Sequence, residues 1–232
     1  MTKVLIVLSA ADHWTRKDGT LYDSGVWAEE FVAIDETLRK AGAEVTLASP
    51  DGVAPTIDGK SVDPEVVGEE LSERMNAYLA ENQARLDAPR KLSEMKGSDF
   101  DAVIIPGGHG PVEDLYKDTD MGRVLIEADE AENIVASVCH GPAALMSAKK
   151  PDGTWQFAGR KLTAFSDEEE VEFGTADNAP WLLAQSLREL GADYSQGPNW
   201  EANIVKDGNL LSGQNPASSQ PLADALVEQL NL

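Results

Sequence analysis

The chain has 232 residues, of which 42% are hydrophobic, so it can bury a substantial core and is not a disordered chain. Its formal net charge of −22 repels nucleic acid and anionic membranes, and we expect neither as a partner. One cysteine excludes an internal disulfide or a multi-thiolate metal site, and only three histidines argue against a zinc centre. No apolar run is long enough to span a bilayer, and the N-terminal run is too short for a signal peptide, which predicts a cytoplasmic protein.

Apolar runs and helical patterns alternate along the chain. In chain order they predict a strand at 4–9, a helix at 26–41, strands at 44–49 and 101–108, a helix at 121–132, a strand at 134–138, a helix from Pro142, a strand at 161–165, and helices at 181–192 and 221–230. Asp207-Gly208, between two apolar runs, predicts a hairpin near the C-terminus. The alternation predicts an α/β fold in which helices cover both faces of a mostly parallel sheet. Sites in such folds lie at the carboxyl ends of the strands.

Residues 53–98 interrupt this alternation. The stretch is polar, mostly helical in pattern and sparse in apolar residues. We interpret it as a helical lid inserted within a single domain that spans residues 1–232, and an ordinary surface excursion is the alternative. The lid and the loop at 10–24 are expected to line the substrate pocket.

The only thiol, Cys139, stands where the strand at 134–138 gives way to a helix. A strand, a nucleophile and then a helix form the layout of a nucleophile elbow, and the small residue Gly141 suits its sharp turn. Near a helix N-terminus, unsatisfied N–H groups should lower the pKa of the thiol and favour the reactive thiolate. A buried structural cysteine is the commoner fate of a lone thiol. The adjacent His140 either meets the thiol at the elbow or turns away to cap a loop.

A glutamate on the first helix gives a second indication of chemistry. At about 100° per residue, Glu30 falls at the edge of the apolar stripe that begins with Trp27, whereas Glu29 falls on the opposite, wet side. An inward glutamate needs a partner or a proton, so burial should raise the pKa of Glu30 and keep it protonated near neutral pH. A boundary glutamate that reaches water is the alternative.

These features together resemble the ThiJ/PfpI superfamily. They are a glutamate on the first helix, PGGHG (106–110) after a strand, and VCHGP (138–142) at the elbow. The chain is most similar to the heat-shock chaperone-like glyoxalase III branch, through GVWAEEF (25–31), the insertion at 53–98 and SGQNPASS (212–219). The resemblance covers nearly the whole chain and implies a flavodoxin-like fold and a homodimer.

The resemblance implies a catalytic role for four positions. Cys139 matches the family's nucleophile, Glu30 the carboxylic acid that hydrogen-bonds it, and His140 the histidine beside it. The segment FSDEEE (165–170) matches the one that supplies an acidic partner to the histidine. We choose Glu170 for this role, with Asp167 as the alternative.

Two further residues are implied to bind substrate. Gly108 matches the glycine whose N–H helps to form an oxyanion site. His109 lies in the same loop, where it either contacts substrate or only braces the turn.

The activity implied by the resemblance is the conversion of methylglyoxal to lactate without glutathione, metal or organic cofactor. The implied partner is therefore a small dicarbonyl substrate. The chain has no histidine after His140, which excludes a glutaminase of the kind that takes its histidine from far downstream. Two alternatives stay open: a redox-sensing holdase chaperone that binds unfolded client proteins, and a cysteine amidohydrolase or peptidase.

Overall fold

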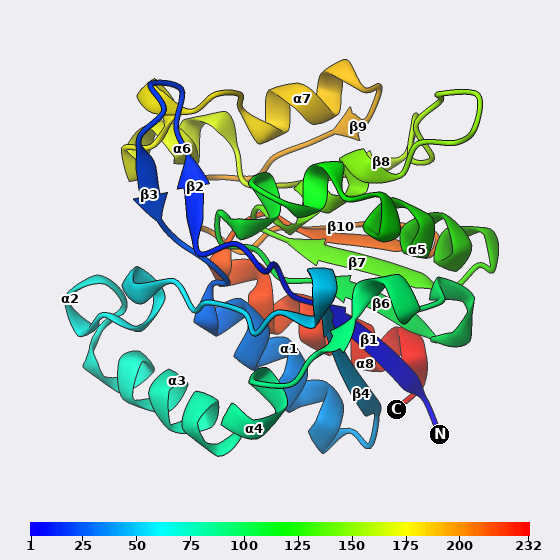
Figure 1. Cartoon of the computed structure of the whole chain (residues 1–232), viewed down its shortest axis with the longest axis horizontal. Helices are drawn as coiled ribbons and strands as arrows, with labels where there is room; N and C mark the ends of the chain where they lie inside the picture. The colour runs from blue at the N-terminus through cyan, green and yellow to red at the C-terminus, as the bar shows by residue number, and fades with distance from the viewer.

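A seven-stranded sheet forms the centre of the protein. The computed structural model describes residues 1–232 and orders the strands β10-β11-β7-β6-β1-β4-β5 (Figure 1). The strands of this sheet are β1 (Lys3–Val7), β4 (Glu44–Ser49), β5 (Arg90–Lys91), β6 (Ala102–Ile105), β7 (Ile134–Val138), β10 (Ile204–Asp207) and β11 (Leu210–Gly213). All neighbours pair in parallel except β10 and β11, which form the predicted hairpin. The predicted α/β class is confirmed.

Helices cover both faces of the sheet, as predicted. They are α1 (Ala28–Lys40), α2 (Pro64–Val67), α3 (Glu69–Glu81), α4 (Gln83–Leu86), α5 (Thr119–Glu130), α6 (Asp167–Phe173), α7 (Leu183–Glu189) and α8 (Ser219–Leu230). The helices α1 and α8 lie side by side on one face, while α5 and α7 lie on the other (Figure 1).

The strands divide their side chains between two hydrophobic cores. In β1, Val4 and Ile6 pack in the core under α1 and α8, whereas Leu5 and Val7 pack in the core under α5. Successive side chains of a strand point to opposite faces, so a strand between two helical layers must be apolar at every position. This is the physical reason why continuous apolar runs identified the central strands in the sequence.

Residues 53–98 differ in part from the predicted helical insertion. Their middle is helical, and α3 packs against α1 through the buried Asp35, which accepts hydrogen bonds from Arg85 and Tyr78. Their C-terminal part, however, supplies the edge strand β5, which pairs in parallel with β4. The sequence did not indicate this strand, because it has only two residues, Arg90 and Lys91, and both are polar and exposed. Whether the segment acts as a lid stays a prediction.

Three other segments depart from the predicted elements. The strand expected at 161–165 is the shorter β8 (Lys161–Leu162), which pairs with β9 (Asp193–Tyr194) outside the main sheet. The loop at 10–24 contains a hairpin, β2 (His13–Thr15) and β3 (Leu21–Asp23). The helix expected from Pro142 is a 3-10 helix, Gly141–Ser147.

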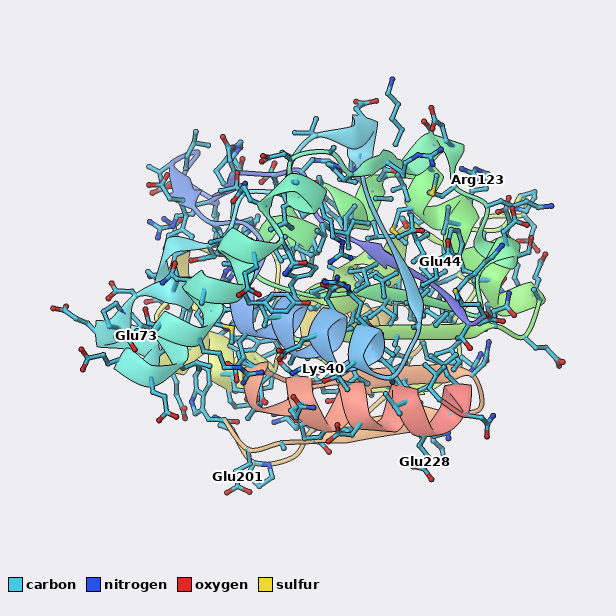
Figure 2. The ribbon with its side chains drawn as sticks, turned by 90° about the horizontal axis from the view of Figure 1, so that it is seen from below. Lys40, Glu44, Glu73, Arg123, Glu201 and Glu228 are labelled. Atoms are coloured by element: carbon cyan, nitrogen blue, oxygen red, sulfur yellow. The ribbon has the colours of Figure 1, made fainter.

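The acidic residues that give the chain its negative net charge lie mainly at the surface. Glu73, Glu201 and Glu228 are exposed and point outward from three different parts of the chain (Figure 2). No helix combines the length and the hydropathy that crossing a membrane requires.

Candidate active site

Cys139 stands in a sharp turn directly after β7. Its φ of +59° lies in the left-handed region, which costs a non-glycine residue about 1 kcal/mol or more. The turn is held by its own peptide groups, because the Cys139 N–H donates to Gly213 and its carbonyl accepts from Phe165. A Cβ on Gly141 would lie 2.2 Å from the carbonyl oxygen of Ile105, so only glycine lets the turn pack against β6. The predicted elbow geometry is therefore present.

The thiol of Cys139 is more enclosed than the sequence suggested. The residue is 5% exposed, and burial raises the pKa of the thiol well above its ordinary value. The neighbouring Glu30 raises the pKa further, whereas the backbone N–H of His140 acts in the opposite direction. The prediction that a helix N-terminus lowers this pKa is wrong for the resting protein. The following helix is only a short 3-10 helix, and its few N–H groups do not outweigh the loss of hydration.

His140 connects the thiol to a buried carboxylate. Its Nδ1 lies 3.4 Å from the Cys139 sulfur, and its Nε2 lies 2.9 Å from Oε1 of Glu170. Since the carboxylate accepts from Nε2–H, Nδ1 is left free to accept the thiol proton. Thr175 donates its hydroxyl to the other oxygen of Glu170 at 2.6 Å, which orients the carboxylate. The three groups form a Cys-His-Glu chain.

Glu170, and not Asp167, is the acidic partner of His140. Burial alone would raise the pKa of Glu170, but His140 and His109 hold it well below its usual range, so it is a carboxylate. Asp167, at the start of the same helix, accepts from Arg188 at 2.9 Å at the surface. The alternative left open by the sequence is thereby decided by geometry.

Glu30 reaches the site from α1. It is completely buried, and its Oε2 accepts the backbone N–H of Gly107 at 2.6 Å. Burial raises the pKa of Glu30 to about 8, and the N–H of Gly107 and the thiol of Cys139 act against this shift. Its Oε1 has no partner in hydrogen-bonding geometry, so its contact with the thiol is looser than a formed hydrogen bond. The expected inward position of this carboxyl is confirmed, and a pKa of about 8 favours its protonated form near neutral pH.

Glu29 is less exposed than predicted. It is half-buried, and burial raises its pKa, while Arg74 acts in the opposite direction. The prediction of a fully wet position was wrong because residues 53–98 fold over this side of α1, which helical periodicity cannot report.

The loop after β6 supplies the two predicted substrate-binding residues. Gly108 adopts φ +84°, and a Cβ there would lie 2.1 Å from the Gly25 carbonyl oxygen, so the turn requires glycine. The backbone N–H groups of Gly108 and His140 donate to no backbone carbonyl, and that of His140 is directed at the Cys139 thiol. Both are therefore free to donate to an oxyanion beside the thiol.

His109 lies at the carboxylate end of the Cys-His-Glu chain. Its Nε2 is 3.5 Å from Oε1 of Glu170, its ring stacks on Trp14 at 4.7 Å, and its centroid lies 4.3 Å from that of His140. Burial and the neighbouring His140 lower the pKa of His109. The ligand atoms of the two histidines and Glu170 lie within 4.8 Å of one another and could hold a metal ion. In the structure, Oε1 of Glu170 instead accepts the hydrogen bond from His140.

A small aromatic cavity of about 40 Å³ leads to the thiol. Its lining residues are Trp27, Gly108, His109, Cys139, His140, Phe165, Phe173, Trp200 and Pro216. Sequence reasoning missed Phe173 and Trp200, as well as Trp14 and Thr175 behind the histidines. The only signal available was the position of Phe173 on the same short helical segment as Glu170.

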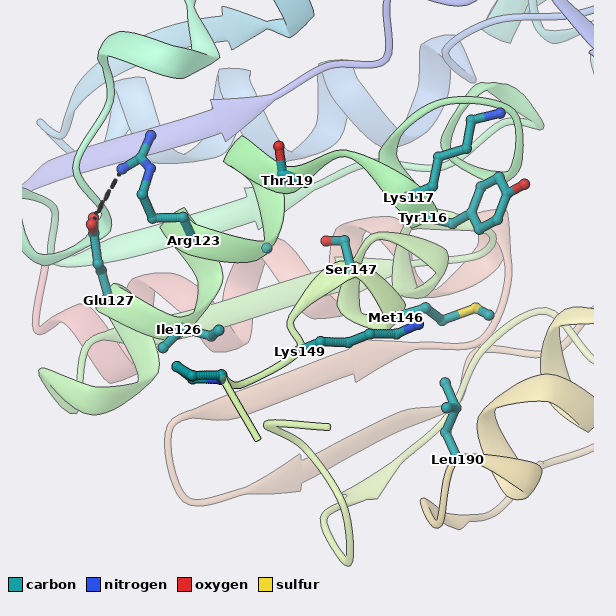
Figure 3. A pocket seen from close by; sticks show the side chains of 12 residues that line it. Tyr116, Lys117, Thr119, Arg123, Ile126, Glu127, Met146, Ser147, Lys149 and Leu190 are labelled. Carbon is teal, nitrogen blue, oxygen red and sulfur yellow. Dashed lines mark hydrogen bonds and ion pairs between the residues drawn. The ribbon is translucent and has the colours of Figure 1, made fainter. Parts of the chain in front are cut away.

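A larger cavity, of about 680 Å³, lies elsewhere. It opens between α5 and the segment around Met146, with Lys117 and Lys149 among its side chains (Figure 3). None of the predicted site residues lines it, so cavity size alone would not have located the chemistry.

The chain is similar to a family profile and to several known proteins. The DJ-1/PfpI family profile matches residues 21–229. Glyoxalase 3 of Candida albicans is 29% identical over 234 residues that cover 98% of each chain. A Schizosaccharomyces pombe protein named Glutathione-independent glyoxalase hsp3102 is 28% identical over 216 residues, 90% of each chain. The crystal structure of glyoxalase III from Candida albicans matches with a TM-score of 0.84 and 28% identity, covering 98% of this chain and 96% of that one.

Proposed function

The chain belongs to the DJ-1/PfpI family, and on that premise we propose that it is a glutathione-independent glyoxalase that converts methylglyoxal to lactate. The observation that carries the proposal is the position of Cys139. Nδ1 of His140 lies 3.4 Å from its sulfur, and the buried Glu30, whose pKa is raised to about 8, also interacts with the thiol. The names of the Candida and fission-yeast relatives support the same reaction.

The first step is attack by the thiol. The S–H proton of Cys139 passes to Nδ1 of His140, and the carboxylate of Glu170 stabilises the resulting imidazolium. Because the pKa of the free thiol is high, this transfer accompanies the attack rather than preceding it. The sulfur bonds to the aldehyde carbon. The oxyanion that forms accepts hydrogen bonds from the N–H groups of Gly108 and His140, and it then takes the proton from the His140 imidazolium to give the hemithioacetal.

The second stage moves one hydrogen between neighbouring carbons. Nδ1 of His140 removes the proton from the former aldehyde carbon while Glu30 protonates the ketone oxygen, which gives an enediol. His140 then returns its proton to the second carbon, and the Glu30 carboxylate takes the hydroxyl proton of the first carbon as the thioester carbonyl forms. Glu30 can play both parts because a carboxyl with a pKa of about 8 exchanges a proton readily near neutral pH. The product is a lactoyl thioester. Water attacks it, and lactate and the Cys139 thiol are released, so the net reaction consumes only methylglyoxal and water.

A direct assay tests this proposal. Purified protein is given methylglyoxal without glutathione, and D- and L-lactate are measured separately. We expect one lactate enantiomer to accumulate, and Cys139→Ala to reduce turnover by about 10³-fold or more. No lactate from the native protein, or equal rates from native protein and variant, would refute the proposal.

Two further assays of the same proteins separate the alternatives left by the sequence. Hydrolysis of amide or peptide substrates without lactate formation would favour the amidohydrolase. If Cys139→Ala still suppresses aggregation of an unfolded client, a holdase activity exists that does not use the thiol. The cytoplasmic location stays a prediction from the sequence, and the homodimer stays a prediction of the resemblance. Sedimentation of the purified protein measures the second.

A further inference from the structure

We propose that Trp200 is the specificity-determining residue of this enzyme: it closes the Cys139 cavity and restricts turnover to short, unbranched 2-oxoaldehydes. The inference rests on the proposed glyoxalase function and adds to it a residue that sets the size limit. It assigns a role to a tryptophan that lies 61 positions after the thiol in the sequence and outside every motif that indicated the site.

The cavity is barely larger than a small substrate. A water molecule needs roughly 10–15 Å³ of such space, so about 40 Å³ holds a few water-sized groups. A keto aldehyde with a methyl group is of this size, whereas an aryl substituent is not. A larger substrate therefore enters only if part of the aromatic wall moves.

Trp200 is the part of the wall that faces solvent. It is 42% exposed, whereas the other residues that line the cavity are buried or half-buried. Its indole ring lies 5.5 Å from the ring of Phe165 and 6.3 Å from that of Phe173, centroid to centroid. The rings meet at interplanar angles of 69° and 47°, so the indole packs against the aromatic wall edge-on or tilted. Because Trp200 both packs on this wall and is exposed, we place it between the cavity and bulk solvent.

Trp200 is held in this position by two acids of α6. Its backbone N–H donates to Oε1 of the buried Glu169 at 2.9 Å, and its indole N–H donates to Glu172 at 2.5 Å. The backbone has φ +62°, a conformation that a tryptophan keeps only when its surroundings impose it. Glu169 also accepts from Asn215 at 2.8 Å, which joins this contact to the segment at 212–219.

The wall and the catalytic carboxylate share one short helix. Within α6, Glu169 and Glu172 hold Trp200, Phe173 lines the cavity, and Glu170 accepts from His140. Trp200 makes its hydrogen bonds to Glu169 and Glu172 and not to a member of the Cys-His-Glu chain. Displacing Trp200 therefore opens the cavity without moving that chain. An entrance at Phe173 or Phe165 would require movement of residues packed on the histidines.

The test compares two substrates in four proteins. Values of kcat/KM for methylglyoxal and for phenylglyoxal are measured with native protein, Trp200→Ala, Trp200→Phe and Trp181→Ala. Using the ratio of the two substrates cancels differences in overall activity between variants. Trp181 is the matched control, because it packs on Tyr116 at 5.1 Å and does not line the Cys139 cavity.

We expect Trp200→Ala to raise the ratio of phenylglyoxal to methylglyoxal about tenfold or more, mainly by lowering KM for phenylglyoxal. Trp200→Phe should give a smaller rise, and Trp181→Ala should leave the ratio unchanged. Glu172→Gln removes the charged acceptor of the indole N–H and should shift the ratio in the same direction as Trp200→Phe. If Trp200→Ala fails to fold in a thermal melt, Trp200→Phe and Glu172→Gln carry the test.

The outcomes separate the two proposals. A ratio that stays within twofold of native in the folded Trp200 variants overturns the role of Trp200, while methylglyoxal turnover by native protein leaves the glyoxalase function standing. Native protein that forms no lactate from methylglyoxal overturns the function itself. Equal use of both substrates by native protein also refutes the size limit.

Discussion

Two carboxyl groups on α1, those of Glu30 and Asp35, are completely buried and lie five residues apart. They differ in whether a cation lies beside them. Asp35 accepts two hydrogen bonds from Arg85, at 2.7 and 2.9 Å, and a third from the hydroxyl of Tyr78 at 2.7 Å. Glu30 has no cation beside it, only the backbone N–H of Gly107 and the thiol of Cys139. Five residues correspond to a rotation of about 140° around a helix, so the two side chains face different neighbours.

The comparison shows that burial alone does not decide what a carboxyl does. A buried charge is stable when a cation and further hydrogen bonds replace water, and this is the situation of Asp35. Without a cation, the group keeps its proton instead, and the pKa of Glu30 rises to about 8. The first arrangement fastens residues 53–98 to the sheet domain, and the second leaves a proton that can move.

The first prediction removes the mobile proton. Glu30→Gln keeps the shape of the side chain, so the variant should fold normally but lose about 10²- to 10³-fold in kcat/KM for methylglyoxal. Glu29→Gln, on the neighbouring position, should stay within about threefold of native, which tests position and not merely charge on α1. Steady-state kinetics and thermal melts measure both. Equal losses in the two variants would contradict the difference drawn between these glutamates.

The second prediction removes the ion pair between Arg85 and the buried Asp35. Arg85→Ala removes the nearer of two arginines from the buried Asp35 and leaves Arg39 at 3.7 Å. It should lower the free energy of unfolding by about 3 kcal/mol, the lower end for buried pairs, because the Arg85 side chain is 28% exposed and Arg39 remains. Turnover at 25 °C should change by less than about threefold while the variant remains folded. Urea denaturation gives the first number and the lactate assay the second. A large loss of kcat with unchanged stability would show that the pair serves chemistry.

The third prediction concerns the carboxylate behind His140. Glu170→Gln should lower kcat about 10- to 100-fold, because an amide cannot stabilise the imidazolium as a carboxylate does. Asp167→Asn is the matched control on the same helix and should have little effect, since Asp167 bonds to Arg188 at the surface. Similar effects from the two substitutions would remove Glu170 from the proposed chain.

The fourth prediction is the smallest and uses pH. The proton on Glu30 is lost as pH rises through its pKa of about 8, so activity should be about half its plateau value at that pH and fall further above it. A carboxyl whose pKa is higher in the folded than in the unfolded protein contributes stability that is fully present at a pH below its unfolded-state pKa. This contribution is lost as pH rises towards the folded-state pKa of about 8. Native protein should therefore lose stability relative to Glu30→Gln between about pH 4.5 and pH 8. Kinetics and urea melts across this range check both statements, and parallel curves for the two proteins would contradict them.

Much of the site could be predicted because its signals are local. The apolar run that ends at Cys139, the glycines after β6, and the inward face of Glu30 each follow from the spacing of a few neighbouring residues. Periodicity reports which face of an element is buried, and the burial of Glu30 was correctly expected for that reason. The same reasoning failed for Glu29, because the segment that covers it comes from residues 53–98.

The sequence by itself determined the order of the central strands and of the long helices, and the ends of the strands where chemistry would gather, since hydrophobic spacing and turn residues act over a few positions. Only the tertiary structure decided how deeply the Cys139 thiol is enclosed, that Glu170 rather than Asp167 meets His140, and that Trp14 and Trp200 complete the site. These are contacts between segments far apart in the chain. Hydration, pKa and cavity size depend on everything packed around a group, and no short stretch of sequence contains that information.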